Sequence, residues 1–107
     1  MAQNIKGARQ FQDVFGEVIP FNATVDPAAF ADDESQVVSV TVTGAAVGDF
    51  VLVSPGVDMQ EGLISATVIS ANTVEIVIGH VGGDSTDLAS STWYGVVLKK
   101  GGAFGNL

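Results

Sequence analysis

The segment from residue 37 to 98 holds most of the patterned residues of this chain, and its pattern is typical of short β-strands separated by turns. From residue 38 to 43, valine alternates with serine or threonine, which gives a strand one buried face and one wetter face. The segment has no cysteine, lysine or arginine, and its only histidine is His80. Because most side-chain chemistry needs a base, a metal ligand or a cationic clamp, these residues indicate a small acidic β module.

Five further segments have the composition of strands. Beyond the strand at 37–43, we expect strands at 17–25, 50–53, 63–70, 74–78 and 92–99. Pro20 places the first of these at an edge or a bend, because proline cannot donate to a ladder. The run 50–53 is apolar throughout, which predicts a strand covered on both faces. In the last strand, Trp93 and Tyr94 point to opposite faces.

Glycine, proline and asparagine mark the turns between these strands. Gly44 and Gly48 frame a tight connection. Pro55 and Gly56 fit the central pair of a type II turn, in which glycine takes the positive φ. Asn72 tolerates the left-handed geometry of a hairpin turn between 63–70 and 74–78.

Short strands about 8–12 residues apart, with Gly- and Pro-rich turns, predict an all-β fold, a small antiparallel β-sandwich or barrel-like domain. We divide the chain into an N-terminal extended arm (1–16), the β-sandwich domain (17–100) and a C-terminal tail (101–107). The apolar arm packs either on its own domain or on a neighbour, since exposed phenylalanines are a liability. The strands carry few charges and no lysine where edges usually place it, which favours oligomerisation.

Size and charge limit the class of protein. The chain has 107 residues, which fits one domain, and a net charge of −8 that disfavours nucleic-acid binding. No apolar run approaches the roughly 18 residues of a membrane helix, and the start lacks a signal peptide. The absence of cysteine fits a product made in the cytoplasm. Two basic residues lie near each end, where they contact an acidic partner, contact the acidic body of the domain, or only keep the termini solvated.

The candidates for chemistry are few. His80 with Asp84 or Asp87 and a serine would make a hydrolytic triad, but no nucleophile motif is present. Zinc needs three or four His or Cys ligands, and the chain has one. Residues 32–34, or Asp84 with Asp87, are acidic enough to contribute to a calcium site, although neither matches an EF-hand loop. We therefore predict no enzyme activity, no cofactor and no metal.

Three stretches resemble a pattern found in small bacteriophage virion proteins and in modules of phage fibres. The first is VTVTGAAVGDFVLVSP at 40–55, and the second is the strand and hairpin turn GLISATVISANTV at 62–74. The third, 84–97, resembles the closing loop and aromatic-bearing strand of that pattern. One departure is His80, where the pattern usually has asparagine.

For a free-standing chain of this length, the resemblance implies a capsid decoration (cement) protein, located on the outer surface of the virion. Its partners would be the major capsid protein and sister copies in a homotrimer, with no nucleic acid and no membrane. The capsid-docking residues assigned on this basis are Ile5, Arg9, Phe11, Phe15 and Phe21. We expect Trp93 and Tyr94 to pack in the core or at a subunit interface, and we assign them to the interface. The alternative is a phage tail or fibre appendage module that recognises the host surface through loops 55–62 and 82–91.

Overall fold

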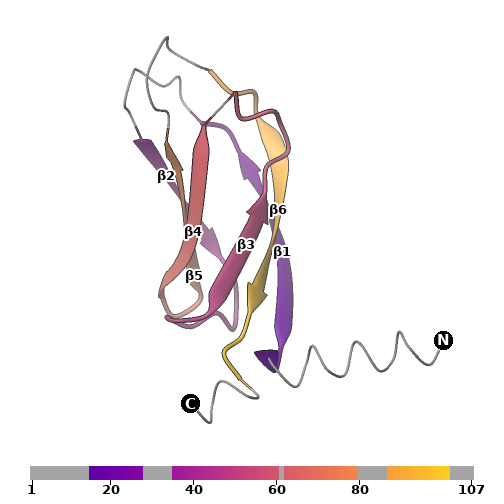
Figure 1. Ribbon diagram of the computed structural model, residues 1–107, viewed down its shortest axis with the longest axis vertical. Coiled ribbons are helices and arrows are strands. Elements are labelled where there is room, and N and C mark those ends of the chain that lie inside the picture. The colour runs from indigo at the N-terminus through magenta and orange to yellow at the C-terminus, as the bar shows by residue number, and fades with distance from the viewer. Residues whose placement is uncertain (1–14, 28–34, 61, 80–86, 102–107) are drawn as a thin grey trace, which may run out of the picture.

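The protein is a β-sandwich. The computed structural model describes residues 15–27, 35–60, 62–79 and 87–101, and within them two three-stranded antiparallel sheets face each other (Figure 1). The strands are β1 (Val18–Val25), β2 (Ser35–Thr41), β3 (Phe50–Ser54), β4 (Leu63–Ser70), β5 (Thr73–Gly79) and β6 (Ser91–Leu98). The predicted all-β class is confirmed, and each strand lies within two residues of its expected bounds at either end. The predicted arm, apart from Phe15 and Gly16, lies outside the described residues, as does the tail after Gly101.

The strand order shows how the two sheets are connected. One sheet has the order β1-β6-β3 and is called the β6 sheet here; the other has the order β2-β5-β4 and is called the β5 sheet. Only β4 and β5 are neighbours both in sequence and in a sheet, so they form the predicted hairpin. The other connections cross between the sheets. β1 is an edge strand, as Pro20 predicts.

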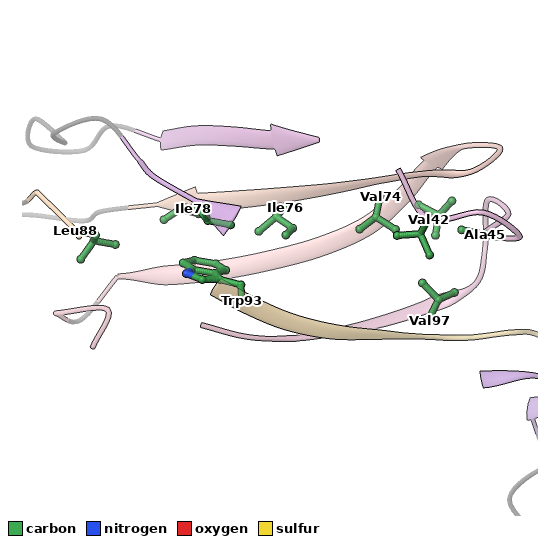
Figure 2. Packing of buried hydrophobic residues seen from close by; sticks show 10 residues of the cluster. Val42, Ala45, Val74, Ile76, Ile78, Leu88, Trp93 and Val97 are labelled. Atoms are coloured by element: carbon green, nitrogen blue, oxygen red, sulfur yellow. The ribbon is translucent and has the colours of Figure 1, made fainter. Parts of the chain in front are cut away.

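The core lies between the two sheets and follows the period-2 pattern of the strands. Val74, Ile76 and Ile78 share the inner face of β5, as predicted, and are 0%, 0% and 1% exposed. They face Trp93 and Val97 of β6, which are equally buried (Figure 2). Removing such side chains from water is the main term that stabilises the sandwich.

The prediction that 50–53 is covered on both faces is wrong. Along β3, Val51 and Val53 pack toward the core, whereas Phe50 and Leu52 are 43% and 62% exposed. The reason is that the β6 sheet packs against the β5 sheet on one side only. A continuous apolar run therefore supplies this strand with an exposed apolar face.

The predicted type II turn at 55–56 is also wrong, because Gly56 does not take a positive φ. Glycine is needed there for another reason: a Cβ at position 56 would lie 2.3 Å from the carbonyl oxygen of Thr92 in β6. By contrast, Gly44 and Gly48 both have φ of +99°, as their turn requires.

Gly56→Ala is expected to destabilise the fold by about 1–3 kcal/mol. The new methyl group would overlap the Thr92 carbonyl oxygen, so the backbone at residue 56 or at Thr92 must move. Urea unfolding followed by circular dichroism measures this difference. Gly79→Ala is the matched control, since a Cβ at Gly79 has no atom within 4 Å, and its effect should be below about 0.5 kcal/mol. Equal losses for the two variants would contradict the close approach of residue 56 to β6.

Asn72 has two functions in the hairpin turn between β4 and β5. It takes the predicted left-handed conformation, with φ of 64°. Its side-chain Oδ1 also accepts a hydrogen bond from the Gly44 N–H at 2.8 Å, and its backbone pairs with Val42 and Ala45. The chain turns after Val42, where the Ala45 N–H donates to the Val42 carbonyl at 3.1 Å and the Asn72 bonds hold the turn in place, so β2 ends at Thr41 and not at the predicted Thr43.

Candidate functional site

The groups considered for catalysis and metal binding do not form a site in the described part of the chain. Within residues 15–27, 35–60, 62–79 and 87–101, no three His, Cys, Asp or Glu side chains lie close enough together to hold a metal ion. His80, Asp84 and the acidic run 32–34 lie outside these ranges, while Asp87 is described and exposed. Among the described residues, no helix has both the length and the apolar character that crossing a bilayer requires.

The outer face of the β6 sheet is the most distinctive surface of the described molecule, and we call it the Leu52–Tyr94 face. The register aligns its outward-pointing residues in rows across β1, β6 and β3. By strand alternation the face consists of Val18, Pro20, Asn22, Thr24, Thr92, Tyr94, Val96, Leu98, Phe50, Leu52 and Ser54. Leu98 points to this side but is only 8% exposed. None of these residues is charged. Two of them, Leu52 and Tyr94, are each 62% exposed.

Between β3 and β6 this face is hollowed into a shallow groove of about 330 Å³ that is wide open to solvent. Its lining residues are Leu52, Val53, Ser54, Tyr94, Gly95 and Val96. Small-molecule sites usually enclose most of their ligand, which a shallow open groove does not do. The groove is better matched to side chains that protrude from another macromolecule.

The opposite outer face, on the β5 sheet, has a different chemistry. Its middle row is Ser39, Glu75 and Thr67, so a carboxylate lies at the centre of the face among hydroxyl groups. Val37 and Leu63 are exposed at 57% and 63% on the edge strands of this sheet. Both outer faces thus have exposed apolar residues, but only the face of the β5 sheet has a charged residue.

The basic C-terminal end of the sandwich is held to its own domain. Lys99 Nζ lies 2.7 Å from Asp49 Oδ2 and donates a second hydrogen bond to the Gly44 carbonyl at 2.8 Å. The other donors to Asp49 are the backbone N–H groups of Ala46 and Lys100, at 2.9 and 3.1 Å. Of the possibilities for the basic ends, Lys99 therefore contacts the acidic body of the domain.

Two opposing effects act on the pKa of Asp49, whose side chain is only 5% exposed. Burial raises the pKa of this carboxyl, because desolvation penalises the charged form. The hydrogen bonds from Lys99, Lys100 and Ala46 and the charge of Lys99 outweigh burial, so the pKa lies below its ordinary value. The carboxylate is therefore a charged structural clamp between the loop after β2 and the end of β6.

The assigned docking residues are placed only in part. Ile5, Arg9 and Phe11 lie outside the described residues. The ring of Phe15 packs edge-to-face against Phe50, with ring centroids 5.9 Å apart, and the Phe15 carbonyl accepts a hydrogen bond from Gly101. Among the described residues, Phe15 already contacts the domain, two residues before its predicted start.

Of two further assigned residues, Trp93 lies in the core and Phe21 is partly buried and packs against it. Phe21 points inward from β1, where a Cβ on Gly95 would lie 2.3 Å from its ring, so its assignment to capsid docking is wrong. Trp93 is 1% exposed within a single chain and donates from Nε1 to Ser91 Oγ at 2.9 Å, so its assignment to a subunit interface is wrong. Tyr94 is well exposed, and its interface assignment stays a prediction.

Strand alternation in the sequence is enough to predict part of the Leu52–Tyr94 face. Val96 lies two residues after Tyr94, so alternation alone places both on one face. For Phe50 and Leu52 no such signal exists, because no polar residue in the run marks its outer side.

Comparison of the chain with protein-family models, with curated proteins and with solved structures finds no match. The charge-free Leu52–Tyr94 face and the strand pattern of 40–97 are therefore the observations from which a function is proposed.

Proposed function

We propose that this protein is a bacteriophage capsid decoration (cement) protein, which binds the outer shell of the virion in many copies. Its partners are the major capsid protein and sister copies of the same chain, associated as a homotrimer. The observation that carries the proposal is the Leu52–Tyr94 face, a charge-free and largely apolar sheet surface on a chain with a net charge of −8. The resemblance of 40–55, 62–74 and 84–97 to virion modules supports the same class.

Leaving such a surface in water costs free energy, because apolar side chains are more stable when removed from water. Exposed apolar patches on small soluble domains usually belong to contacts with other macromolecules. All four edge strands, β1, β2, β3 and β4, lack a charged residue, although charged side chains are a common protection against edge pairing. A protein built for repeated contacts in an assembly meets both conditions, and many weak contacts then stabilise a lattice by avidity.

The second candidate function is a tail or fibre appendage module that recognises the host surface. One row of the face favours it: Tyr94 lies between Asn22 and Ser54 in the register. An exposed aromatic ring flanked by an amide and a hydroxyl group is a suitable platform for a sugar.

The copy number of this chain in purified virions separates the two functions. Quantitative mass spectrometry is expected to find hundreds of copies per particle if the protein decorates the shell. A handful of copies would support a tail or vertex location and therefore host recognition. Absence from the particle would overturn both.

Deleting residues 1–14 is expected to abolish binding to capsids that lack this protein, because the deletion removes Ile5, Arg9 and Phe11. The fold should be retained, since the deletion leaves Phe15 with its contacts to Phe50 and Gly101. Co-sedimentation with capsids measures binding, and circular dichroism checks the fold. Deleting 102–107 is the control at the other terminus and should leave binding intact. Retained binding without residues 1–14 would refute the arm as the docking element.

A further inference from the structure

We infer that the Leu52–Tyr94 face is covered by a second copy of this chain. The inference rests on the self-association included in the proposed function and names the surface that makes the contact. It is independent of the capsid, because two copies can be examined in solution.

Charge distinguishes the two outer faces as contact surfaces for a second copy. Each copy has twelve acidic and four basic residues, so two copies repel each other over most of their surface. A contact through the β5 sheet would bury Glu75 near the centre of the interface. A contact through the Leu52–Tyr94 face brings no carboxylate of that face into the interface. Of the two outer faces, this one allows two acidic molecules to approach most closely.

The same absence of charge disfavours a strongly charged partner. Such a partner would find no counter-charge on the face, and its own charges would lose water without an ion pair in return. Two lysines follow β6: Lys99 is engaged by Asp49 at 2.7 Å, and neither Lys99 nor the exposed Lys100 belongs to the face. The face therefore offers apolar and hydroxyl contacts, which a second copy of the same face or of the neighbouring edge can match.

The edge of β3 extends this surface. β1 is protected from edge pairing by Pro20, and β4 carries a register irregularity between Val68 and Ser70. β3 has neither a proline nor a bulge nor a charge, a condition that β2 of the β5 sheet shares, and β3 contributes Phe50 and Leu52 to the face. Face and edge together make a continuous surface around the groove.

The test compares two leucines that differ in little except their sheet. Leu52 is 62% exposed on β3 and Leu63 is 63% exposed on β4, and both strands are edges. Leu52→Glu and Leu63→Glu make the same change in net charge. Sedimentation velocity of wild type should show an oligomer, Leu52→Glu should weaken the association at least ~tenfold, and Leu63→Glu should leave it unchanged. Circular dichroism and thermal unfolding check that each variant is folded.

A variant of the opposite charge distinguishes burial of residue 52 in an interface from charge repulsion between the two copies. Leu52→Lys lowers the net negative charge, so simple repulsion between acidic copies would predict tighter association. Burial of residue 52 in an interface predicts weaker association for lysine and glutamate alike.

Each remaining outcome contradicts a different part of the argument. A wild-type protein that stays monomeric at every concentration would overturn this inference and the proposed homotrimer, while capsid binding would be judged separately by the deletion of residues 1–14. An oligomer that Leu52→Glu leaves intact, or that Leu63→Glu weakens equally, would overturn the Leu52–Tyr94 face and leave self-association standing.

Discussion

Replacing Trp93 with alanine is expected to lower the free energy of unfolding by about 3–5 kcal/mol, which is a large part of the stability of a domain this small. Trp93 is among the largest fully buried side chains, at 1% exposed, and lies between the sheets beside the Val74–Ile78 row of β5 (Figure 2). Alanine at this position leaves a cavity that two β-sheets can close only in part. It also removes the N–H group that donates to Ser91 Oγ. The Ser91 hydroxyl lies at the edge of the core, so a water molecule can take the place of this donor.

Urea unfolding at a fixed protein concentration measures this effect, because self-association would make the apparent stability depend on concentration. Circular dichroism is the appropriate signal, since Trp93 is the only tryptophan of the chain. Val37→Ala is the control: Val37 is 57% exposed on β2, and its loss should cost less than about 1 kcal/mol. A loss below about 1 kcal/mol for Trp93→Ala would contradict the packing of the two sheets around this ring.

The parts of the fold that the sequence predicts are those in which polar and apolar residues alternate. In β5, Glu75 marks one face and thereby assigns Val74, Ile76 and Ile78 to the other. The same reasoning applies to Phe21, because Asn22 and Thr24 mark the outer face of β1 and leave Phe21 inside. Alternation in β1 therefore already predicts an inward-pointing Phe21, in conflict with its assignment to docking.

Other features depend on which strands become neighbours, and alternation does not contain this information. Val51 and Val53 cannot be told from Phe50 and Leu52 by pattern, because all four are apolar. Gly56 is required by a carbonyl of Thr92, which lies 36 residues later in the chain. Only the strand order β1-β6-β3 brings these groups together, and the same order builds the Leu52–Tyr94 face.

The clamp between Asp49 and Lys99 is likewise a long-range contact, because its partners are 50 positions apart in the sequence. We expect Asp49→Asn to lower the free energy of unfolding at neutral pH by about 1–3 kcal/mol, since it removes the charge that accepts three hydrogen bonds. The Lys99 ammonium would then be left near the Gly44 carbonyl without its counter-ion.

The acid dependence of this effect follows from the direction of the pKa shift. The pKa of Asp49 is lowered in the folded protein from its ordinary value of 3.8, so the unfolded chain binds the proton more tightly. The stability that the carboxylate contributes is therefore fully present well above 3.8 and is lost as the pH falls through the folded pKa. Urea unfolding of wild type and Asp49→Asn, measured from neutral pH to below 3.8, should show the difference shrinking in acid.

Two variants establish that the clamp is the cause. Asp87→Asn makes the same change at an exposed carboxyl, so it should leave the free energy of unfolding at neutral pH nearly unchanged. Lys99→Met removes one of the three donors to Asp49 and leaves the N–H groups of Ala46 and Lys100 in place, so its cost should be smaller than that of Asp49→Asn. If Asp49→Asn matched wild type at neutral pH, or if the difference did not shrink in acid, the carboxylate would not hold the loop after β2 to the end of β6.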